Sequence, residues 1–498
     1  MTKLLAFVVL VLCPLLAAAR AAEKPAAYPP PKLGDTSTWG RKVQRTMRLL
    51  ATSTPEKRNT VRVLFYGQSI TEQRWWQAVA DDLRSRFPHA NLVIENRALG
   101  GFASQMLVKT AETDLYPFYP DLLIFQVYGA HDKYEDILRR VRQRTTAEIL
   151  QQNDHVTNPA EFHEETDPAK LWPPNGRQWP AFMNHNWLPT LSRRYGTELC
   201  DQRGIWKRYL AENGLQPSRL LIDGVHLNAH GEFLMARCVE AYLRYDPRLA
   251  PAAADDWVKT CAVGKDAAWR DGSLRLEFEG NRVDAIVAPT RTEWGRSASD
   301  KAPSPAAHGV TQGTARSAAV RIDGRRPAEL PELYGFTRTR ATPGGKWPPI
   351  APLRSEKLLQ LEDWTMEAAK DAKDAKLYHF TLRGSKTGPD GEGRSDRRFV
   401  SRSGRIVIEP EDWNVEYALA LPGIKPVPAH FTVTWGVVPH FADEFVSPGV
   451  ADPAVETVVT LAQGLANGRH VLEIGGGPET PIAALRVYRP PLGREGSR

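Results

Sequence analysis

Short apolar runs alternate with longer amphipathic segments over the first half of the chain. The apolar runs cover residues 61–66, 91–96, 121–128 and 147–153. Apolar residues at helical spacing lie between them, around residues 73–87, 102–112 and 133–144. Continuous apolar strands that alternate with helices are typical of a parallel sheet covered on both faces. The pattern therefore predicts a doubly wound α/β domain over residues 61–248.

The pattern changes after about residue 254. Short alternating strands, broken by Gly, Pro and Asp, occur at residues 273–287, 318–326, 377–384, 405–413, 430–438, 455–465 and 468–477. Because few helical stretches interrupt them, residues 255–498 are predicted to form an all-β domain, most simply a jelly-roll-like sandwich. Residues 294–317 are predicted to be a loop. The lead at residues 22–60 contains one helix, in which Val43, Met47 and Leu50 share a face.

The N-terminus has the features of a secretory signal peptide. Residues 1–21 combine Lys3, an unbroken apolar core and the small-residue pattern Ala19-Arg20-Ala21. We therefore expect an exported, periplasmic or extracellular protein. A lipoprotein anchor at Cys13 is disfavoured, because the apolar run continues beyond it. No later apolar stretch is long enough to span a bilayer, so no membrane span is expected after signal removal.

Charge and cysteine content narrow the class further. The net charge of the 498-residue chain is +7, and it becomes +5 when Lys3 and Arg20 leave with the signal. No Lys/Arg block concentrates this modest excess, so nucleic-acid binding is not expected, and an acidic glycan fits only weakly. Cleavage leaves Cys200, Cys238 and Cys261. An odd and small number of cysteines argues against a disulfide scaffold, although the sequence still allows a single disulfide.

Polar or glycine-rich turns follow the strands of the α/β domain. They lie at residues 67–69, 96–101, 129–132 and 221–231. Ligands of such sheets bind at the carboxyl ends of the strands, so the four turns are expected to converge on one site. Asp223 can orient the imidazole of His226, which can take the proton of Ser69. An isolated Ser69 would be read as a helix N-cap, but the set of four turns favours a nucleophile.

Four motifs resemble blocks I, II, III and V of the SGNH (GDSL-like) hydrolase superfamily. They are GQSIT, NRALGG, GAHD and DGVHLN, in that order, within residues 62–245. The resemblance implies a flavodoxin-like sheet and ester hydrolysis through an acyl-enzyme, without a cofactor. It implies that Ser69 is the nucleophile and an oxyanion donor through its N–H, and that Gly101, or alternatively Gly100, supplies the second donor. Asp223 and His226 match the block V pair.

Two positions depart from the family pattern. Gln68 stands where the family usually has an aspartate, which is mainly a supporting residue. His131 stands where the family has an asparagine that donates to the oxyanion. An imidazole N–H can also donate one hydrogen bond, so we expect His131 to take this place in the oxyanion hole.

A long irregular insertion is expected to line the substrate site, since such loops often bind ligands. Trp179 and Trp187, together with Trp172, are predicted sugar platforms, and His155 is predicted to be a pocket-wall residue. A metal site is not expected, because no compact ligand spacing relates the acidic and imidazole side chains of this region. These side chains are Asp154, His155, His163 and His185.

Together these features predict an exported serine esterase that removes ester groups, most simply O-acetyl groups, from a polysaccharide or oligosaccharide. Gln68 and His131 keep a second class open, namely a glycan-binding protein with a dormant SGNH domain. A third reading is a glycan O-acyltransferase, because hydrolysis and transfer share the acyl-enzyme. The sequence leaves the sugar, the ester position and the oligomeric state open.

Overall fold

The computed structural model describes residues 28–174, 176, 178–249, 253–288, 317–421 and 423–493. The predicted signal peptide at residues 1–21 and almost all of the predicted loop at residues 294–317 lie outside these ranges.

A five-stranded parallel sheet forms the centre of the first half of the chain. Its strands follow the order β2-β1-β3-β4-β5, and all pair in parallel. Their bounds are β1 Thr60–Gly67, β2 Asn91–Asn96, β3 Leu122–Gln126, β4 Glu148–Gln152 and β5 Glu198–Cys200. This order is that of flavodoxin-like doubly wound sheets, in which ligands bind outside the carboxyl ends of the strands. The prediction of a doubly wound α/β domain is confirmed.

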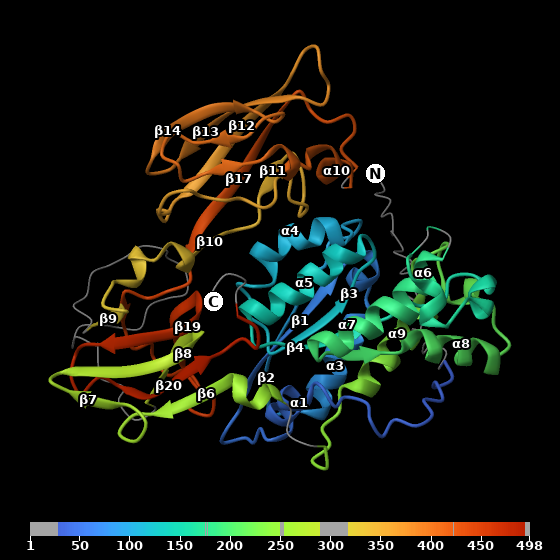
Figure 1. Cartoon of the computed structure of the whole chain (residues 1–498), viewed down its shortest axis with the longest axis horizontal. Coiled ribbons are helices and arrows are strands. Elements are labelled where there is room, and N and C mark those ends of the chain that lie inside the picture. The colour runs from blue at the N-terminus through green and yellow to red at the C-terminus, as the bar shows by residue number, and fades with distance from the viewer. Residues whose placement is uncertain are drawn as a thin grey trace, which may run out of the picture.

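Helices cover both faces of this sheet (Figure 1). One face packs against α1 Gln44–Ala51, α3 Trp75–Arg86, α8 Gln202–Glu212 and α9 Ala229–Tyr242. The other face packs against α4 Ser104–Asp114, α5 His131–Arg144 and α7 Leu188–Tyr195. Apolar side chains that alternate along β1 divide between the two cores, with Phe65 in one and Leu64 in the other. The fully buried Val43 and Met47 join the first core, as the helical pattern of the N-terminal lead predicted.

Shorter helical segments complete the α/β region. They are α2 Ser69–Glu72, α6 Trp179–Ala181, the π-helical turn η3 Phe182–Trp187, and the 3₁₀ turns η1 Pro159–His163, η2 Pro168–Leu171 and η4 Pro217–Leu220. The insertion between β4 and β5 therefore contains three of these turns and α6, with α7 leading into β5.

The remaining chain is β-rich, as predicted, and its strands form two larger antiparallel sheets with separate hydrophobic cores. The seven-stranded sheet contains β6 Val258–Ala262, β7 Ala268–Arg270, β8 Ser273–Val287, β9 Ala318–Ile322, β18 Glu444–Phe445, β19 Val458–Ile474 and β20 Ile482–Tyr488. The six-stranded sheet contains β10 Tyr334–Phe336, β11 Arg340–Thr342, β12 Asp363–Lys370, β13 Tyr378–Gly384, β14 Gly388–Arg394 and β17 His430–Pro439. Beside it lie the β15 Phe399–Val400 and β16 Val407–Ile408 pair and α10 Val415–Ala420. The sequence predicted one sandwich and did not predict that the strands divide into two units with separate cores.

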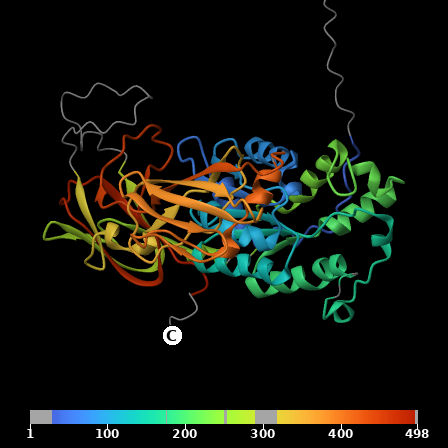
Figure 2. The same ribbon diagram turned by 90° about the horizontal axis from the view of Figure 1, so that it is seen from above.

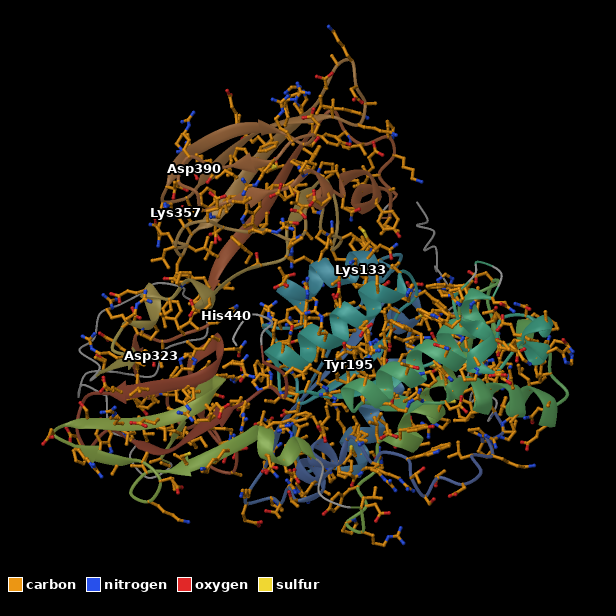
Figure 3. The ribbon with its side chains drawn as sticks, in the orientation of Figure 1. Lys133, Tyr195, Asp323, Lys357, Asp390 and His440 are labelled. Atoms are coloured by element: carbon orange, nitrogen blue, oxygen red, sulfur yellow. The ribbon has the colours of Figure 1, made fainter. Side chains whose placement is uncertain are left out.

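The order of the strands shows that one β unit is inserted into the other. The chain leaves the seven-stranded sheet after β9, builds residues 334–439, and returns to it at β18. We call residues 334–439 the inserted β unit. His440, labelled in Figure 3 between the two units, directly follows β17 at this return. Four short 3₁₀ turns complete the β-rich part, namely η5 Ala253–Trp257, η6 Pro327–Glu329, η7 Pro331–Leu333 and η8 Pro410–Asp412.

Both β units lie beside the α/β domain, as Figures 1 and 2 show together. The unit with the seven-stranded sheet contacts the segment between α4 and β3 through Tyr119, whose hydroxyl donates to Asn281 at 2.8 Å. The inserted unit contacts α4 through Arg338, which forms a largely buried ion pair with Asp114 at 2.9 Å. Loss of either Arg338 or Asp114 would leave the other charge buried without its partner, so this ion pair favours the docked position of the inserted unit on α4.

Candidate active site

Ser69 lies just beyond the carboxyl end of strand β1, which pairs with both β2 and β3. The strand ends at Gly67, Gln68 is extended at φ −113° and ψ −153°, and α2 begins at Ser69. A Cβ on Gly67 would overlap the backbone oxygen of Gln126 on β3, so glycine permits the close approach of this turn to the sheet. The local sequence thus places a hydroxyl at the sheet edge, at the N-terminus of a short helix.

Ser69, His226 and Asp223 form one continuous chain of hydrogen bonds. The Nε2 atom of His226 lies 3.0 Å from the Oγ atom of Ser69, and its Nδ1 atom lies 2.8 Å from Oδ2 of Asp223. A carboxylate can only accept, so Nδ1 carries the proton and Nε2 is left to accept the proton of the serine hydroxyl. The structure therefore brings together the three residues that the sequence predicted, in nucleophile, base and orienting positions.

A tight turn holds the Asp223 carboxylate in place. Its Oδ1 atom accepts the backbone N–H groups of Val225 and His226, each at 2.7 Å. Ile222 donates its N–H to the backbone oxygen of His226 at 2.8 Å, which closes the turn. These hydrogen bonds, the one from the His226 backbone first, lower the pKa of Asp223 to about 2. The orienting carboxylate is therefore ionised throughout the neutral range.

Backbone N–H groups near Ser69 are free to stabilise an oxyanion. In the described part of the chain, the N–H groups of Ser69, Gly100 and Gly101 have no acceptor. A Cβ built on Gly100 would lie 3.7 Å from the Cβ of Ser69, so the glycine turn borders the serine. Gly101 has a φ of +79°, in the left-handed region that glycine adopts without strain. The assignment of Ser69 and Gly101 as oxyanion donors remains a prediction.

His131 lies at the first position of α5, at the carboxyl end of β3. Its ring packs between Trp179, Phe182 and Trp187, with ring centroids 5.0 to 5.5 Å apart. Among the described residues the ring has no hydrogen-bond partner, whereas its backbone oxygen accepts from Trp187 Nε1 at 3.0 Å. Its role as a side-chain oxyanion donor remains a prediction.

The structure corrects the placement of His155. The residue follows β4 as expected, but its side chain is fully buried and cannot form a pocket wall. Its Nε2 atom lies 2.8 Å from the backbone oxygen of Val225, in the turn between Asp223 and His226. His155 therefore supports, from the protein interior, the turn that holds Asp223 and His226. Asp154 lies 3.3 Å from its Nδ1 atom, and burial raises the pKa of this carboxyl.

The predicted sugar platforms are also partly corrected. Trp187 is only 9% exposed, because its indole packs in the core beside His131, so it offers no platform. Trp179 is partly buried against the same ring. Trp172 is 55% exposed, and its ring stacks on that of Trp187 with centroids 6.1 Å apart. Of the three indoles, it is the one most accessible to a ligand. Helical periodicity could not show which indole is buried, because Trp172 follows a 3₁₀ turn, Trp179 begins a three-residue helix, and Trp187 ends a π-helical turn.

Sequence reasoning missed three residues of the inserted β unit that contact the site. The Nε1 atom of Trp347 donates to the Gly100 oxygen at 3.0 Å, and the Tyr417 hydroxyl donates to the Gly101 oxygen. Lys346 pairs with Glu72 of α2. These contacts join residues separated by 247 to 316 positions along the chain, so no local signal in the sequence could have indicated them.

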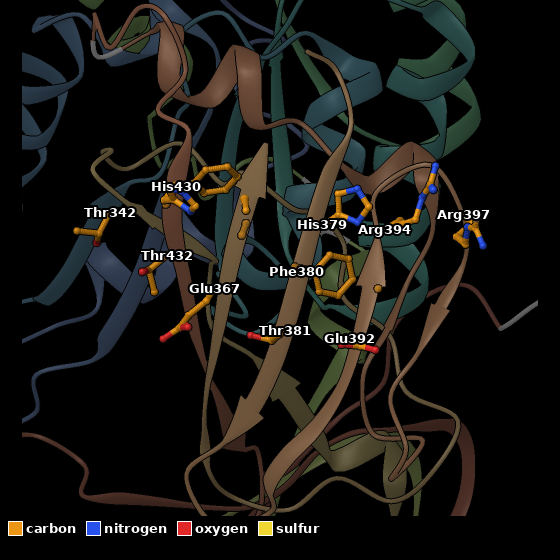
Figure 4. Close-up of a pocket in the computed structure, with 14 residues that line it drawn as sticks. Thr342, Glu367, His379, Phe380, Thr381, Glu392, Arg394, Arg397, His430 and Thr432 are labelled. Atoms are coloured by element: carbon orange, nitrogen blue, oxygen red, sulfur yellow. The ribbon is translucent and has the colours of Figure 1, made fainter. Parts of the chain in front are cut away.

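A separate pocket of about 870 Å³ lies on the outer face of the inserted β unit (Figure 4). Thr432, Glu367, Thr381 and Glu392 form one cross-strand row over β17, β12, β13 and β14. None of the residues of the Ser69 site lines this pocket. Its polar row is the solvated face of a sheet whose other face carries the core.

The remaining candidate features of the described ranges are metal-binding groups, membrane-spanning helices and cysteines. No group of three or more His, Cys, Asp and Glu side chains there could hold a metal ion. No helix there is long and apolar enough to cross a bilayer. Cys200, Cys238 and Cys261 are buried, free thiols.

No protein-family model and no curated protein matches this chain. Among solved structures, it is similar to a putative GDSL-like lipase from Parabacteroides merdae, with 19% identity, a TM-score of 0.30, and coverage of 39% of this chain and 100% of that one. It is similar to an acetylxylan esterase from Geobacillus stearothermophilus, with 15% identity and a TM-score of 0.31. The match covers 39% of this chain and 98% of that one. It is also similar to a two-domain esterase active on acetylated mannans, with 13% identity and a TM-score of 0.32. That match covers 90% of this chain and 95% of the other.

Proposed function

We propose that this protein is a serine esterase that removes ester groups, most simply O-acetyl groups, from a polysaccharide through an acyl-enzyme on Ser69. The observation that carries the proposal is the hydrogen-bonded chain from Ser69 through His226 to Asp223, with distances of 3.0 and 2.8 Å. The four motifs that resemble SGNH hydrolases support the same reaction.

The proposed reaction has two half-steps. His226 Nε2 takes the hydroxyl proton while Ser69 Oγ attacks the ester carbonyl, and free backbone N–H groups stabilise the tetrahedral oxyanion. Collapse expels the sugar alcohol, which receives the proton from His226 and leaves the acyl group on Ser69. Water then attacks the acyl-enzyme with His226 as base, which releases acetate and restores the serine.

Acetate release is the direct test. The purified protein should hydrolyse a chromogenic acetyl ester and release acetate from some members of a panel of acetylated polysaccharides. Ser69→Ala should abolish both activities. Ser85→Ala is the matched control, because Ser85 is an exposed serine of α3 and should leave turnover unchanged. Equal turnover by the wild type and Ser69→Ala would remove Ser69 as the nucleophile.

Two alternatives give different products. A dormant glycan-binding protein would bind polysaccharide without turnover of any acyl ester, and the intact Ser69, His226 and Asp223 chain argues against it. An acyltransferase would place the acetyl group on an added sugar, so product analysis with and without sugar acceptors distinguishes transfer from hydrolysis.

We also propose that the protein is exported, on the basis of residues 1–21 alone. N-terminal sequencing of protein recovered from outside the cytoplasm should begin at Ala22 or Glu23. Recovery of the intact N-terminus from the cytoplasm alone would contradict export.

A further inference from the structure

Gly100 and Gly101 are the central residues of a tight turn beside Ser69. The N–H of Phe102 donates to the backbone oxygen of Leu99 at 3.0 Å, which closes a four-residue turn. Gly101 occupies the third position with a φ of +79°, whereas Gly100 has no positive φ in the left-handed range. This combination matches a type II turn. The first residue of the turn is anchored to the sheet, since Leu99 donates to the oxygen of Gly67 at 2.9 Å.

The central peptide of such a turn has two opposite orientations. Types I and II differ mainly in the second ψ and third φ angles, which reverses the peptide between the two central residues. Glycine at the third position allows both forms. In this turn the reversible peptide contains the carbonyl of Gly100 and the N–H of Gly101. Its orientation therefore decides whether the Gly101 N–H can reach an oxyanion on the substrate of Ser69.

A residue from the inserted β unit fixes that orientation. Trp347 Nε1 donates to the Gly100 oxygen at 3.0 Å. The C=O and N–H of a trans peptide point in opposite directions within one rigid plane. A donor that holds the carbonyl therefore aims the Gly101 N–H to the opposite side. The same bond polarises the peptide, which makes its N–H a stronger donor.

Contacts around Trp347 keep the donor in place. Its ring packs, together with Leu421, against the α/β core that includes the fully buried Leu99. Its neighbour Lys346 pairs with Glu72, the last residue of the short helix that Ser69 begins. The inserted unit thus holds both the nucleophile's helix and the glycine turn.

We propose that Trp347 is a positioning residue that locks the Gly100–Gly101 peptide in the orientation required for oxyanion stabilisation, so that the inserted β unit completes the active site of the α/β domain. This inference rests on the proposed esterase function. Tyr417 supplies a natural comparison. It donates to the oxygen of Gly101, but the N–H of that peptide belongs to Phe102 and already bonds to Leu99.

Trp347→Phe, which keeps an aromatic ring and removes the N–H, tests the inference. Loss of one oxyanion donor typically lowers kcat by about 10²- to 10³-fold, and a turn that still visits the productive form should lose about 10- to 100-fold. KM should change less than about threefold, because the interaction forms chiefly in the transition state. The inhibition constant of a boronic acid that forms a tetrahedral adduct on serine should rise in parallel with the fall in kcat, a change that altered packing alone would not produce.

Tyr417→Phe removes the bond to the other peptide of the turn, whose N–H is already occupied, so it should lower kcat clearly less than Trp347→Phe does. Trp347→His, which retains a ring N–H, should recover part of the loss. Active sites titrated with a phosphonate ester normalise kcat, so a partly unfolded preparation still gives a valid value. The inference is overturned if folded Trp347→Phe keeps kcat within threefold of the wild type, if only KM changes, or if Tyr417→Phe loses as much. Absence of Ser69-dependent turnover in the wild type would instead overturn the proposed function.

Discussion

Gln73 and Leu227 exchange two hydrogen bonds across the active site. The side-chain Nε2 of Gln73 donates to the backbone oxygen of Leu227 at 2.8 Å, and the backbone N–H of Leu227 donates to Gln73 Oε1 at 2.9 Å. Gln73 directly follows the helix that begins at Ser69, and Leu227 directly follows His226. This pair therefore ties the helix that begins at Ser69 to the turn that holds His226.

Gln73→Ala should lower kcat by about tenfold or more, because small displacements of catalytic groups reduce rates strongly. The Ser69 hydroxyl and His226 imidazole would lose their shared support, while substrate contacts would stay. Steady-state kinetics on a chromogenic acetyl ester measures the effect. Gln77→Ala is the control, because Gln77 is an exposed glutamine of α3. Equal kcat values for the two variants would show that the pair does not position the base.

The pH dependence of activity follows from the ionisation of Asp223. Its pKa is lowered to about 2, first by the hydrogen bond from the His226 backbone, so the carboxylate is ionised above about pH 4. Asp223 therefore adds no ionisation of its own to the pH–activity profile above that pH. The logarithm of kcat/KM should rise with a slope of one on the acid side, measured from pH 4 to 9. A slope of two would mean that Asp223 titrates in the same range.

His155→Phe tests the buried support of the catalytic turn. The substitution leaves the Val225 oxygen without its donor and removes the imidazole beside Asp154, whose carboxyl keeps the Gln126 amide at 3.3 Å. We expect kcat to fall by about three- to tenfold and the melting temperature to fall, because a buried polar group without a partner costs about 1–3 kcal/mol. Turnover of a small ester and of a polysaccharide should fall equally. A selective loss on the polysaccharide would indicate the pocket-wall role that burial argues against.

The sequence predicted the parts of this fold that have continuous local patterns. Four of the five sheet strands are long enough to appear as apolar runs, whereas β5, Glu198–Cys200, has three residues and leaves no run. The turn residues Ser69, Asp223 and His226 were predictable because each belongs to a short motif, although the turn with Asp223 and His226 follows the 3₁₀ turn η4 and not a sheet strand. The division of the β-rich part was not predictable, since alternation shows which face of a strand is buried but not which strand it pairs with.

The remaining site residues depend on tertiary contacts. His155 follows β4, so its position predicted a place near the sheet edge, but its ring turns into the protein. Trp172 and Trp187 are fifteen residues apart in one insertion, and only the packing of its π-helical turn decides which indole is buried. Trp347 reaches Gly100 because the inserted β unit docks on α4, a contact that residue spacing cannot encode.

The insertion between β4 and β5 is held by the carboxylate of Glu164. Its oxygens accept from Arg203 and Lys207 of α8 at 2.6 to 2.7 Å, and from His185 at 2.8 Å. Burial opposes ionisation, but these hydrogen bonds prevail and hold the pKa of Glu164 well below its usual range.

Because the folded-state pKa is depressed, this stabilisation is present above the unfolded-state pKa and is lost as pH falls below it. Glu164→Gln should therefore lower the free energy of unfolding by about 2–4 kcal/mol near pH 7, since it leaves the buried Arg203 with one fewer anion. The difference from the wild type should shrink below about pH 4. Thermal melts at pH 7 and pH 3 measure this. A difference that grows as the pH falls would contradict the ionised carboxylate.

His131→Ala tests the remaining oxyanion donor. If the ring N–H stabilises the oxyanion, kcat should fall by about two orders of magnitude with a smaller change in KM, because this interaction forms in the transition state. We expect His131→Asn, which restores an amide donor, to recover part of that loss. The aromatic neighbours Trp179, Phe182 and Trp187 give a purely structural role its own signature. A lower melting temperature with near-normal kcat per titrated active site in His131→Ala would assign the ring to packing and remove it from the oxyanion hole.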